Sequence, residues 1–243
     1  MTAPTPERLF DVLAATWPAA RVLPVGPWVL RQGNGGGQRV SAATAEGAVT
    51  GDDISWAERQ MRAMGQHPLF MIRTGHDGLD NQLAQRNYQV SDPTVLYVAP
   101  TDPLTAELPL TAAMPSWPPL ATQRELWANG GVGPARVAVM ERATGPKTAI
   151  LGRSGDVPAG TAFVAADDTI AMVHAIEVDP TQRRQGVGRR LMHACANWAT
   201  DNGATWLCLA VTRANAPAII LYHALGMAEV ASYHYRRAPE NVG

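Results

Sequence analysis

A short segment rich in glycine and arginine has the clearest chemical meaning in this sequence. A hydrophobic stretch ends, a polar turn follows, and Gly186 and Gly188 stand before an amphipathic run that predicts a helix. The first N–H groups of a helix lack intrahelical partners and lie at the positive end of its dipole, so they can bind phosphate. Arg183, Arg184 and Arg189 add positive charge there. The segment predicts a pyrophosphate site, and a plain glycine turn with solvated arginines is the alternative.

Known motifs narrow the chemistry of this segment. The dinucleotide-binding pattern GxGxxG fails because Leu191 occupies its third glycine position, and the sequence has no GK[ST] of a P-loop. A serine hydrolase is not supported, because GxSxG does not occur. His193 and Cys195 are two positions apart on the expected helix and point in different directions, so we expect no metal site.

A second segment follows about one helix and one strand later. Asn215 is a good helix N-cap, Pro217 suits the first helical turn, and Gly226 suits the position after the last turn. This helix carries Tyr222, which is either a half-buried aromatic residue or a proton donor. The residue types alone leave both readings open.

The surrounding pattern predicts the elements that position these segments. Antiparallel strands followed by strand–helix–strand–helix–strand indicate an α/β protein with a mixed sheet. In the first half we expect helices at Pro6–Ala15, Ile54–Met64 and Gly78–Arg86, a strand or hairpin at Ala20–Arg31, and strands at Arg39–Ala45, Leu69–Arg73 and Thr94–Val98. In the second half we expect helices at Leu120–Ala128, Gly188–Asn202 and Ala216–Leu225, and strands at Thr148–Arg153, Gly160–Ala165, Thr169–Val178, Thr205–Val211 and Glu229–Tyr235.

We expect the proline-rich stretch Thr101–Pro119 to be a linker or a crossing segment between two halves, because its prolines exclude a long helix or a central strand. It divides the chain into residues 1–103 and 104–243. A faint internal similarity relates Leu83–Pro100 to Tyr222–Pro239, each with a helix end, a turn and a closing strand. Coincidence is the competing explanation.

The two motifs together resemble a known family. Arg183-x-x-Gly186-x-Gly188 at a strand-to-helix junction is similar to the acetyl-CoA loop [RQ]-x-x-G-x-[GA] of the GNAT N-acetyltransferase superfamily. The family pattern N-x-x-A-x-x-L-Y-x-x-x-G-[FM] is matched by Asn215, Ala218, Leu221, Tyr222, Gly226 and Met227. The resemblance implies the GNAT acyl-CoA N-acyltransferase fold in residues 104–243, preceded by a smaller GNAT-like half.

The resemblance also implies roles for individual residues. Acetyl-CoA would be the co-substrate, Tyr222 the general acid for the leaving thiolate, and a primary amine the direct attacking group. The residues that would bind acetyl-CoA are Ile176 and Val178 through their backbone, the loop Arg183, Arg184, Gln185, Gly186, Val187, Gly188 and Arg189, and Asn215.

The general base is left open. Glu177 and His174 lie on the expected strand Thr169–Val178, three positions apart, so we expect them on opposite faces. His174 is in phase with the apolar residues, which favours a core histidine, and Glu177 is either catalytic or a solvated carboxylate. A water chain is a third solution.

The first half carries no comparable phosphate loop. Gly51, Asp52 and Asp53 stand where one would be, and two aspartates repel a pyrophosphate. Leu83 occupies the position that corresponds to Tyr222 in the internal similarity. We therefore interpret the first half as a degenerate GNAT-like copy that does not bind the cofactor.

Composition limits the remaining function classes. The 243 residues, about one large or two small domains, are 46% hydrophobic and carry 20 basic and 21 acidic side chains. A near-neutral chain is not typical of a general nucleic-acid binder. Two cysteines exclude a disulfide framework, and no signal peptide or long apolar span is evident. We expect a cytoplasmic protein without nucleic-acid or membrane partners.

The leading hypothesis is an acetyl-CoA-dependent N-acetyltransferase acting on a small-molecule amine or a peptide N-terminus. A non-catalytic acyl-CoA-binding sensor is the alternative, which Tyr222 disfavours because a sensor needs no proton donor. We expect no metal, and the sequence leaves open the acceptor and whether the chain forms a homodimer.

Overall fold

The computed structural model describes residues 2–109 and 111–239. The chain forms two compact units that do not follow a single cut in the sequence. Unit 1 comprises Met1–Pro18, Leu96–Val211 and Asn215–Val230, and unit 2 comprises Ala19–Val95, Thr212–Ala214 and Ala231–Gly243. Strands β5 (Gln89–Pro100) and β11 (Ala228–Arg237) each begin in one unit and end in the other. The division into two GNAT-like halves at residue 103 stays a prediction.

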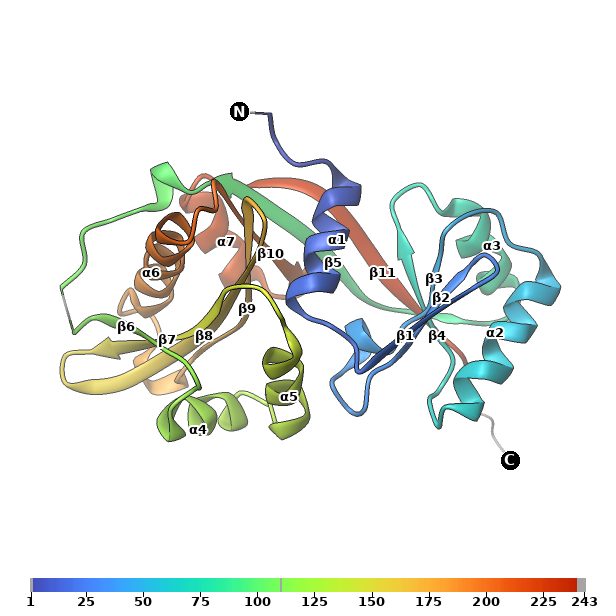
Figure 1. Ribbon diagram of the computed structural model, residues 1–243, viewed down its shortest axis with the longest axis horizontal. Coiled ribbons are helices and arrows are strands. Elements are labelled where there is room, and N and C mark those ends of the chain that lie inside the picture. Colours follow the sequence, from blue (N-terminus) through green and yellow to red (C-terminus); the bar gives the residue numbers. More distant parts are fainter. Residues whose placement is uncertain (1, 110, 240–243) are drawn as a thin grey trace. The chain divides into compact units, whose positions relative to one another are not determined.

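Unit 1 contains a mixed sheet in which β5, β10, β9, β8, β7 and β6 are neighbours in that order (Figure 1). Strands β6 to β9 pair antiparallel, and β9 and β10 pair parallel. The predicted mixed α/β sheet is therefore confirmed. Its other elements are α1 (Pro6–Thr16), η2 (Asp102–Leu104), β6 (Ala113–Ser116), α4 (Ala121–Asn129), α5 (Pro134–Arg142), β7 (Lys147–Ser154), β8 (Val157–Asp167), β9 (Ile170–Val178), η3 (Pro180–Gln182), α6 (Val187–Asp201), β10 (Trp206–Thr212) and α7 (Ala216–Ala224).

The two faces of this sheet are covered by different helices. Helix α6 packs closely on one face, because a Cβ added at Gly152 or Gly160 would meet Leu191 at 2.9 or 3.2 Å. On the other face, Phe163 of β8 lies 6.2 Å from the ring of Trp17, which follows α1. Glycines on β7 and β8 thus let α6 approach the strands, while aromatic side chains fill the opposite layer.

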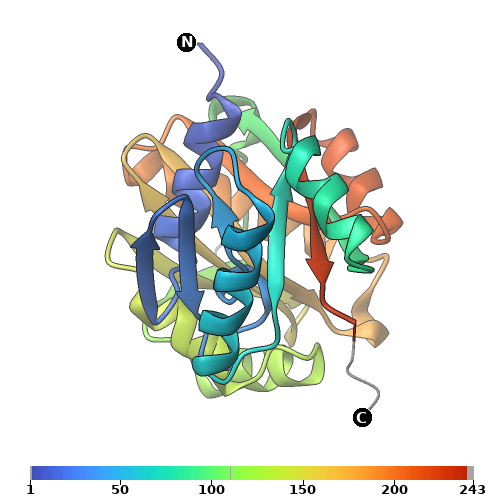
Figure 2. The same ribbon diagram turned by 90° about the vertical axis from the view of Figure 1, so that its right-hand side faces the viewer.

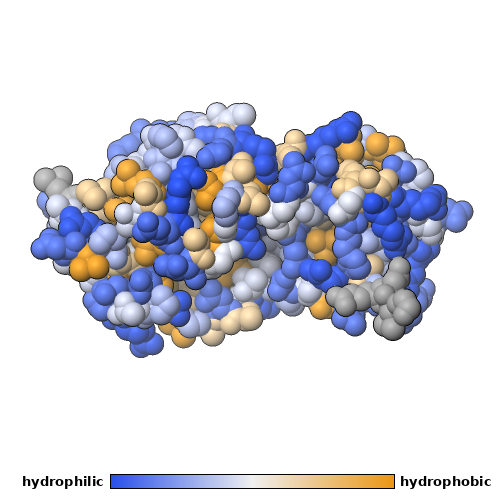
Figure 3. Space-filling view, turned by 90° about the horizontal axis from the view of Figure 1, so that it is seen from below, coloured by the Kyte–Doolittle hydropathy of each residue, from blue (hydrophilic) through white to orange (hydrophobic). Residues whose placement is uncertain are grey.

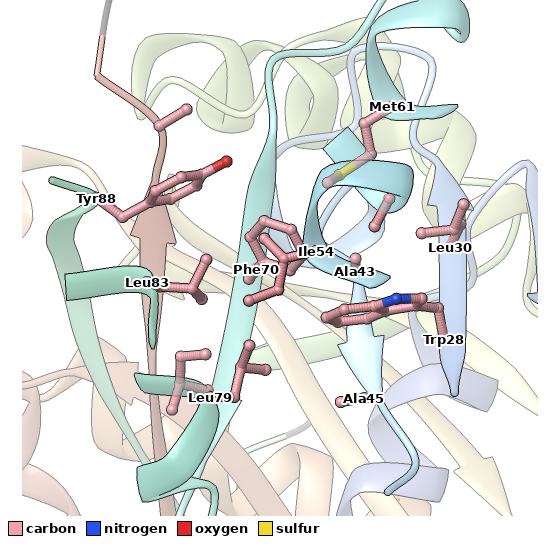
Figure 4. Close-up of a cluster of buried hydrophobic side chains, with 13 residues drawn as sticks. Trp28, Leu30, Ala43, Ala45, Ile54, Met61, Phe70, Leu79, Leu83 and Tyr88 are labelled. Carbon is pink, nitrogen blue, oxygen red and sulfur yellow. The ribbon is translucent and has the colours of Figure 1, made fainter. Parts of the chain in front are cut away.

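Unit 2 has a small antiparallel sheet of β1 (Arg21–Val25), β2 (Trp28–Gln32) and β3 (Thr44–Ala45). A 3₁₀ turn, η1 (Gln38–Val40), lies between β2 and β3 in the chain. Strand β4 (Leu69–Arg73) pairs antiparallel with β11, and α2 (Gly51–Ala63) and α3 (Asp77–Gln85) lie in front of these strands in Figure 2. Trp28, Phe70, Met61, Leu83 and their neighbours form the apolar core of the unit (Figure 4).

Two local predictions differ from the structure. The strand expected over Arg39–Ala45 is wrong: residues 38–40 form the 3₁₀ turn, and only Thr44–Ala45 is extended. A local side-chain bond competes with strand pairing here, because Ser41 Oγ donates to Gly37 O at 3.0 Å. The expected linker Thr101–Pro119 contains strand β6, whose Pro115 is tolerated because β6 is the last strand in the sheet order.

Helix α5 was missed by the sequence patterns for a physical reason. Its buried residues include Val137 and Val139, whose spacing of two is typical of a strand and not of a helix. Pro134 at its first turn is the one signal that favoured a helix start.

Among the described residues, none of the helices is both long and apolar enough to cross a membrane. On the face shown in Figure 3, hydrophobic residues occur in patches between hydrophilic ones. The large apolar side chains exposed on unit 2 are Val22, Val25 and Val90, and those exposed on unit 1 are Leu120, Val157 and Ile220.

Candidate active site

Strand β9 is interrupted by a bulge that opens one of its edges. Ala175 has a φ of 48°, the register with β8 shifts beside it, and its carbonyl accepts a bond from Trp127 Nε1 at 2.7 Å. The parallel register with β10 ends at the pair Leu209–Val173. The predicted cofactor residues Ile176 and Val178 therefore lie beyond the part of β9 that pairs with β10, where the backbone edge on that side can accept an extended ligand.

The two glycines of the predicted phosphate loop serve different purposes. Gly186 is the N-cap of α6 and has a φ of 76°, a left-handed conformation that other residues rarely adopt. A Cβ at Gly188 would lie 3.3 Å from Leu221 of α7 and 4.0 Å from Val178. Gly186 thus makes the turn, and Gly188 lets the first turn of α6 pack against α7.

Side chains of α6 and β7 form hydrogen bonds with Gln185 of the loop. Arg190 donates to Gln185 O at 2.9 Å and to Arg153 O at 3.1 Å, and Ser154 Oγ donates to Gln185 Oε1 at 2.7 Å. Arg190 was not among the predicted site residues. The local sequence does not distinguish Arg190 from Arg189, because the role of Arg190 depends on a partner in β7.

The predicted arginines lie beside this loop. Arg183, Arg184 and Arg189 are exposed, and Arg183 Nε donates to Val178 O at 3.3 Å. Val187 is buried and packs near Gly152 and Gly160, so only its backbone faces the helix N-terminus. The loop therefore presents backbone N–H groups flanked by cationic side chains.

Helix α7 begins at the predicted residue, Ala216, and ends one residue before the predicted Leu225. Asn215 Oδ1 accepts from Ala218 N at 3.3 Å, which confirms Asn215 as the N-cap. Tyr222 is 5% exposed, and its ring lies 6.0 Å from that of Tyr97. Burial raises the pKa of Tyr222 well above its ordinary value, with a further contribution from the thiol of Cys195. Tyr222 therefore holds its proton at neutral pH.

Glu177 and His174 lie on the same face of the sheet, so the prediction of opposite faces is wrong. His174 pairs with Phe163 and Glu177 with Thr161, and these partners are two residues apart on β8. The bulge at Ala175 adds one residue to β9 and restores the common face. The sequence does not indicate this bulge, because the residues of the strand are mostly hydrophobic on both sides of Ala175.

His174 is a core histidine. Thr16 Oγ1 donates to Val12 O at 2.6 Å and lies 2.8 Å from His174 Nε2, so the imidazole donates to Thr16. The His174 ring also lies 4.9 Å from that of Trp17. These bonds tie His174 to α1 and leave Glu177 as the carboxylate of the site.

The environment of Glu177 favours a proton acceptor. Its carboxyl group packs over the backbone of Gly130, where an added Cβ would lie 2.4 Å from the carboxyl carbon. Burial raises the pKa of Glu177, and Arg183 and Arg136 oppose this rise. A raised carboxylate pKa makes the group a stronger base.

Thr161 was missed by the sequence analysis. It faces Glu177 across the β8–β9 pair, is fully buried, and its Oγ1 has no hydrogen-bond partner among the described residues. Buried hydroxyls are normally bonded, so this one marks a position for a water or a ligand atom. Nothing in the local sequence distinguishes Thr161, because its partner is on another strand.

A metal site would require several ligand side chains close together in the part of the chain that the structure describes. No group of three or more His, Cys, Asp or Glu residues there could hold a metal ion.

Comparisons with known proteins agree with this geometry. The model of the acetyltransferase (GNAT) family matches residues 110–227. An uncharacterized N-acetyltransferase, YobR of Bacillus subtilis (strain 168), is 26% identical over 240 residues, covering 95% of this chain and 97% of that protein. A streptothricin acetyltransferase of Streptomyces lavendulae is 42% identical over 80 residues, which span 32% of this chain and 42% of that protein.

The solved structure of a GCN5-related N-acetyltransferase from Kribbella flavida has the same fold, with a TM-score of 0.70, 22% identity and 98% coverage of both chains. With the family match, these similarities define the class of protein. Residues 110–227 belong to the acetyltransferase (GNAT) family, and the protein is an acyltransferase.

Proposed function

We propose that the protein is an N-acetyltransferase that transfers the acetyl group of acetyl-CoA to a primary amine. The observation that carries this proposal is the juxtaposition in unit 1 of an open edge of β9, an uncapped helix N-terminus and the buried Tyr222. The residues fit the cofactor, because glycine at 186 and 188 leaves the first turn of α6 accessible and three arginines flank it.

Each part of acetyl-CoA has a candidate partner. Backbone groups of Ile176 and Val178 would bond the pantetheine arm as a further strand. The N–H groups from Arg184 to Arg189, with Arg183 beside them, would bind the pyrophosphate, and Asn215 would contact the arm through its amide nitrogen. Bound acetyl-CoA supplies an acetyl thioester, which the amine attacks directly.

Tyr222 and Glu177 would carry out the two proton transfers of the reaction. Tyr222 holds its proton because of its raised pKa and would donate it to the leaving thiolate. Glu177 would accept the proton that the attacking amine loses, directly or through a water held by the Thr161 hydroxyl. Backbone N–H groups near the thioester would stabilise the oxyanion.

The acceptor is a small-molecule amine or a peptide N-terminus. The relative from Streptomyces lavendulae is named for streptothricin, so antibiotics with primary amines belong among the acceptors to test. The experiment is a thiol-release assay with acetyl-CoA across amines, polyamines, amino acids, antibiotics and peptides. Amine-dependent release supports the proposal, whereas acetyl-CoA binding without release for any amine favours the sensor.

A further inference from the structure

The turn between α4 and α5 lies against the carboxyl group of Glu177. Trp127, in the last turn of α4, donates from Nε1 to Ala175 O at 2.7 Å and ties the end of this helix to β9. The backbone of Gly130 then packs so closely against the Glu177 carboxyl group that a side chain at this position has no room. Helix α5 begins at Pro134, a few residues after this contact (Figure 1), so its first turn starts close to Glu177.

Arg136 lies in this first turn, and its charge acts on Glu177. Burial raises the pKa of Glu177, and the charges of Arg183 and Arg136 lower it. Arg136 is exposed, and its guanidinium forms no hydrogen bond or ion pair with the other described residues. The N-cap of α5, Gly133, makes no side-chain bond, and the first turn contains no acidic residue. The positive end of the helix dipole therefore adds to the charge of Arg136.

The second arginine that acts on Glu177 has other partners. Arg183 Nε donates to a backbone carbonyl of β9 at 3.3 Å. Hydrogen bonds from Thr181 lower the pKa of Asp179, and the charge of Arg183 lowers it further, so Asp179 is an anionic neighbour of Arg183. The carboxylates of Glu177 and Asp179 thus balance the two arginines in the free chain. Arg136 is the arginine of the two whose guanidinium is bonded to no other described residue.

The charged residues of α4 do not alter this balance. Arg124 Nη2 lies 3.3 Å from Glu141 Oε1 of α5, so these two exposed residues compensate each other. Glu125 lies midway between the two residues of α4 that are buried against the sheet, and therefore points away from it. An incoming acceptor thus meets one anionic and one cationic side chain, Glu177 and Arg136.

This place is open to a ligand. Glu177 is partly buried, whereas Gly130, Gly131 and Arg136 are exposed. Thr161 faces Glu177 across the β8–β9 pair, and its fully buried Oγ1 has no hydrogen-bond partner among the described residues. A buried hydroxyl of this kind is normally satisfied by water or by a ligand. The charged pair and the buried hydroxyl without a partner therefore indicate the same position.

We propose that the acceptor of the acetyl group is a free amino acid, whose carboxylate binds Arg136 and whose amine binds at Glu177. This inference rests on the proposed acetyl transfer and names its acceptor class. An amino acid brings one ammonium and one carboxylate, so each charge meets its opposite and the charges of the site stay balanced. A guanidinium offers paired N–H donors that match a carboxylate. A polyamine brings positive charge alone, and its second ammonium would meet Arg136.

The carboxylate of the amino acid would position the amine and take no part in bond making. The ammonium first loses a proton to Glu177, which passes it to solvent. The neutral nitrogen then bonds to the acetyl carbon, and the C–S bond breaks. Tyr222 protonates the thiolate and regains a proton from the same nitrogen, so one of the three ammonium hydrogens stays in the amide.

A thiol-release assay with saturating acetyl-CoA tests this inference. The probes are the standard amino acids, each with its amide and its decarboxylated amine, and spermidine. We expect at least one amino acid to have a kcat/KM about tenfold or more above those of its two derivatives. The amine of an amide loses its proton more readily than that of the acid, so ionisation of the amine cannot cause this preference.

Variants of Arg136 separate acceptor binding from a structural effect. Arg136→Gln should raise the KM for the amino acid about tenfold, with little change in kcat and in the KM for its amide or for acetyl-CoA. Arg136→Glu should raise the KM for the amino acid further and lower it for spermidine, because the charge is reversed. The matched control Arg124→Gln removes an exposed arginine of neighbouring α4 and should leave every KM unchanged.

Two results would overturn this inference and leave the acetyl transfer standing. One is faster acetylation of amides, decarboxylated amines or spermidine than of every amino acid by the wild-type chain. The other is an equal KM for the amino acid in the folded Arg136→Gln and wild-type chains. Absence of thiol release with any amine would instead contradict the acetyl transfer, and this inference with it.

Discussion

The N-termini of α2 and α6 present the same backbone groups with opposite consequences. At α2, Thr50 Oγ1 accepts from Asp53 N at 3.3 Å, and Asp53 Oδ2 accepts from Thr50 N at 2.8 Å. At α6, the N-cap is Gly186, which makes no side-chain cap bond, and arginines flank the turn. At α2, Thr50 and Asp53 bond to the N-terminal N–H groups, whereas at α6 the N-terminal N–H groups stay available for an external anion.

The C-terminal ends of α3 and α7 have the same backbone turn but carry different side chains, leucine in α3 and tyrosine in α7. Tyr88 N donates to Leu83 O and Met227 N donates to Tyr222 O, each at 3.0 Å, in the positions related by the internal similarity. Asn87 and Gly226 have left-handed φ values of 62° and 75° at the equivalent step. The same turn, with a left-handed glycine, also ends α2, α4 and α6, so it is a common helix ending and not a mark of an internal copy. The interpretation of the first half as a degenerate copy stays a prediction.

The largest effect is expected at the open N-terminus. Gly186→Glu places an anionic side chain in a left-handed position at the helix start, so acetyl-CoA binding should be abolished. Isothermal titration calorimetry measures this. The control Gly78→Glu lies at the start of α3 with nothing within 4 Å of an added Cβ, and it should bind normally. Unchanged affinity in a folded Gly186→Glu chain would remove the phosphate loop from the account.

Tyr222→Phe removes the proton donor that distinguishes α7 from α3. We expect turnover to fall about a hundredfold while the Kd for acetyl-CoA changes little, because the hydroxyl acts on the leaving group. A thiol-release assay gives the rate. The control Tyr97→Phe removes the hydroxyl of the neighbouring buried ring and should keep the rate. An undiminished rate in Tyr222→Phe would exclude the general-acid role.

Glu177→Gln tests the proposed base. Burial raises the pKa of Glu177 above 4.5, and a base acts only when deprotonated, so kcat/KM should fall as the pH drops through this raised value. At neutral pH the kcat/KM of the variant should be about tenfold to a hundredfold lower, and its fall at acidic pH should disappear. If kcat/KM of the variant falls at acidic pH as it does in the wild-type chain, the group that accepts the proton is not Glu177.

Thr161→Val keeps the shape of the side chain and removes the hydroxyl opposite Glu177. We expect about a tenfold lower kcat with an unchanged KM for acetyl-CoA, and recovery in Thr161→Ser. Thr148→Val is the matched control, because Thr148 Oγ1 bonds to Ala149 O on neighbouring β7. If Thr161→Val and Thr148→Val behave alike in kinetics, Thr161 has no part in the reaction.

The smallest effect is expected at the capped helix. Thr50→Ala breaks the capping box of α2 and should lower the free energy of unfolding by about 1 kcal/mol. Chemical denaturation measures this change. Acetyl-CoA affinity should stay unchanged, and a parallel loss of affinity would show that α2 takes part in cofactor binding.

Local signals explain what the sequence could predict. Proline, glycine and asparagine at helix ends act within a few residues, so the starts of α1, α6 and α7 and the strand Leu69–Arg73 were predicted closely. The bulge at Ala175 has no glycine or proline to mark it, so the face of Glu177 was predicted wrongly. The partners of Glu177, Gly130 and Thr161, come from distant segments and could not be inferred from spacing.

The central claim is that acetyl-CoA binds at the N-terminus of α6 and not at that of α2. The stoichiometry of acetyl-CoA binding to the wild-type chain, measured by calorimetry, tests this claim most directly. The account predicts one molecule per chain. A second molecule per chain would show that the first half also binds the cofactor, and the absence of any binding would contradict the proposed site itself.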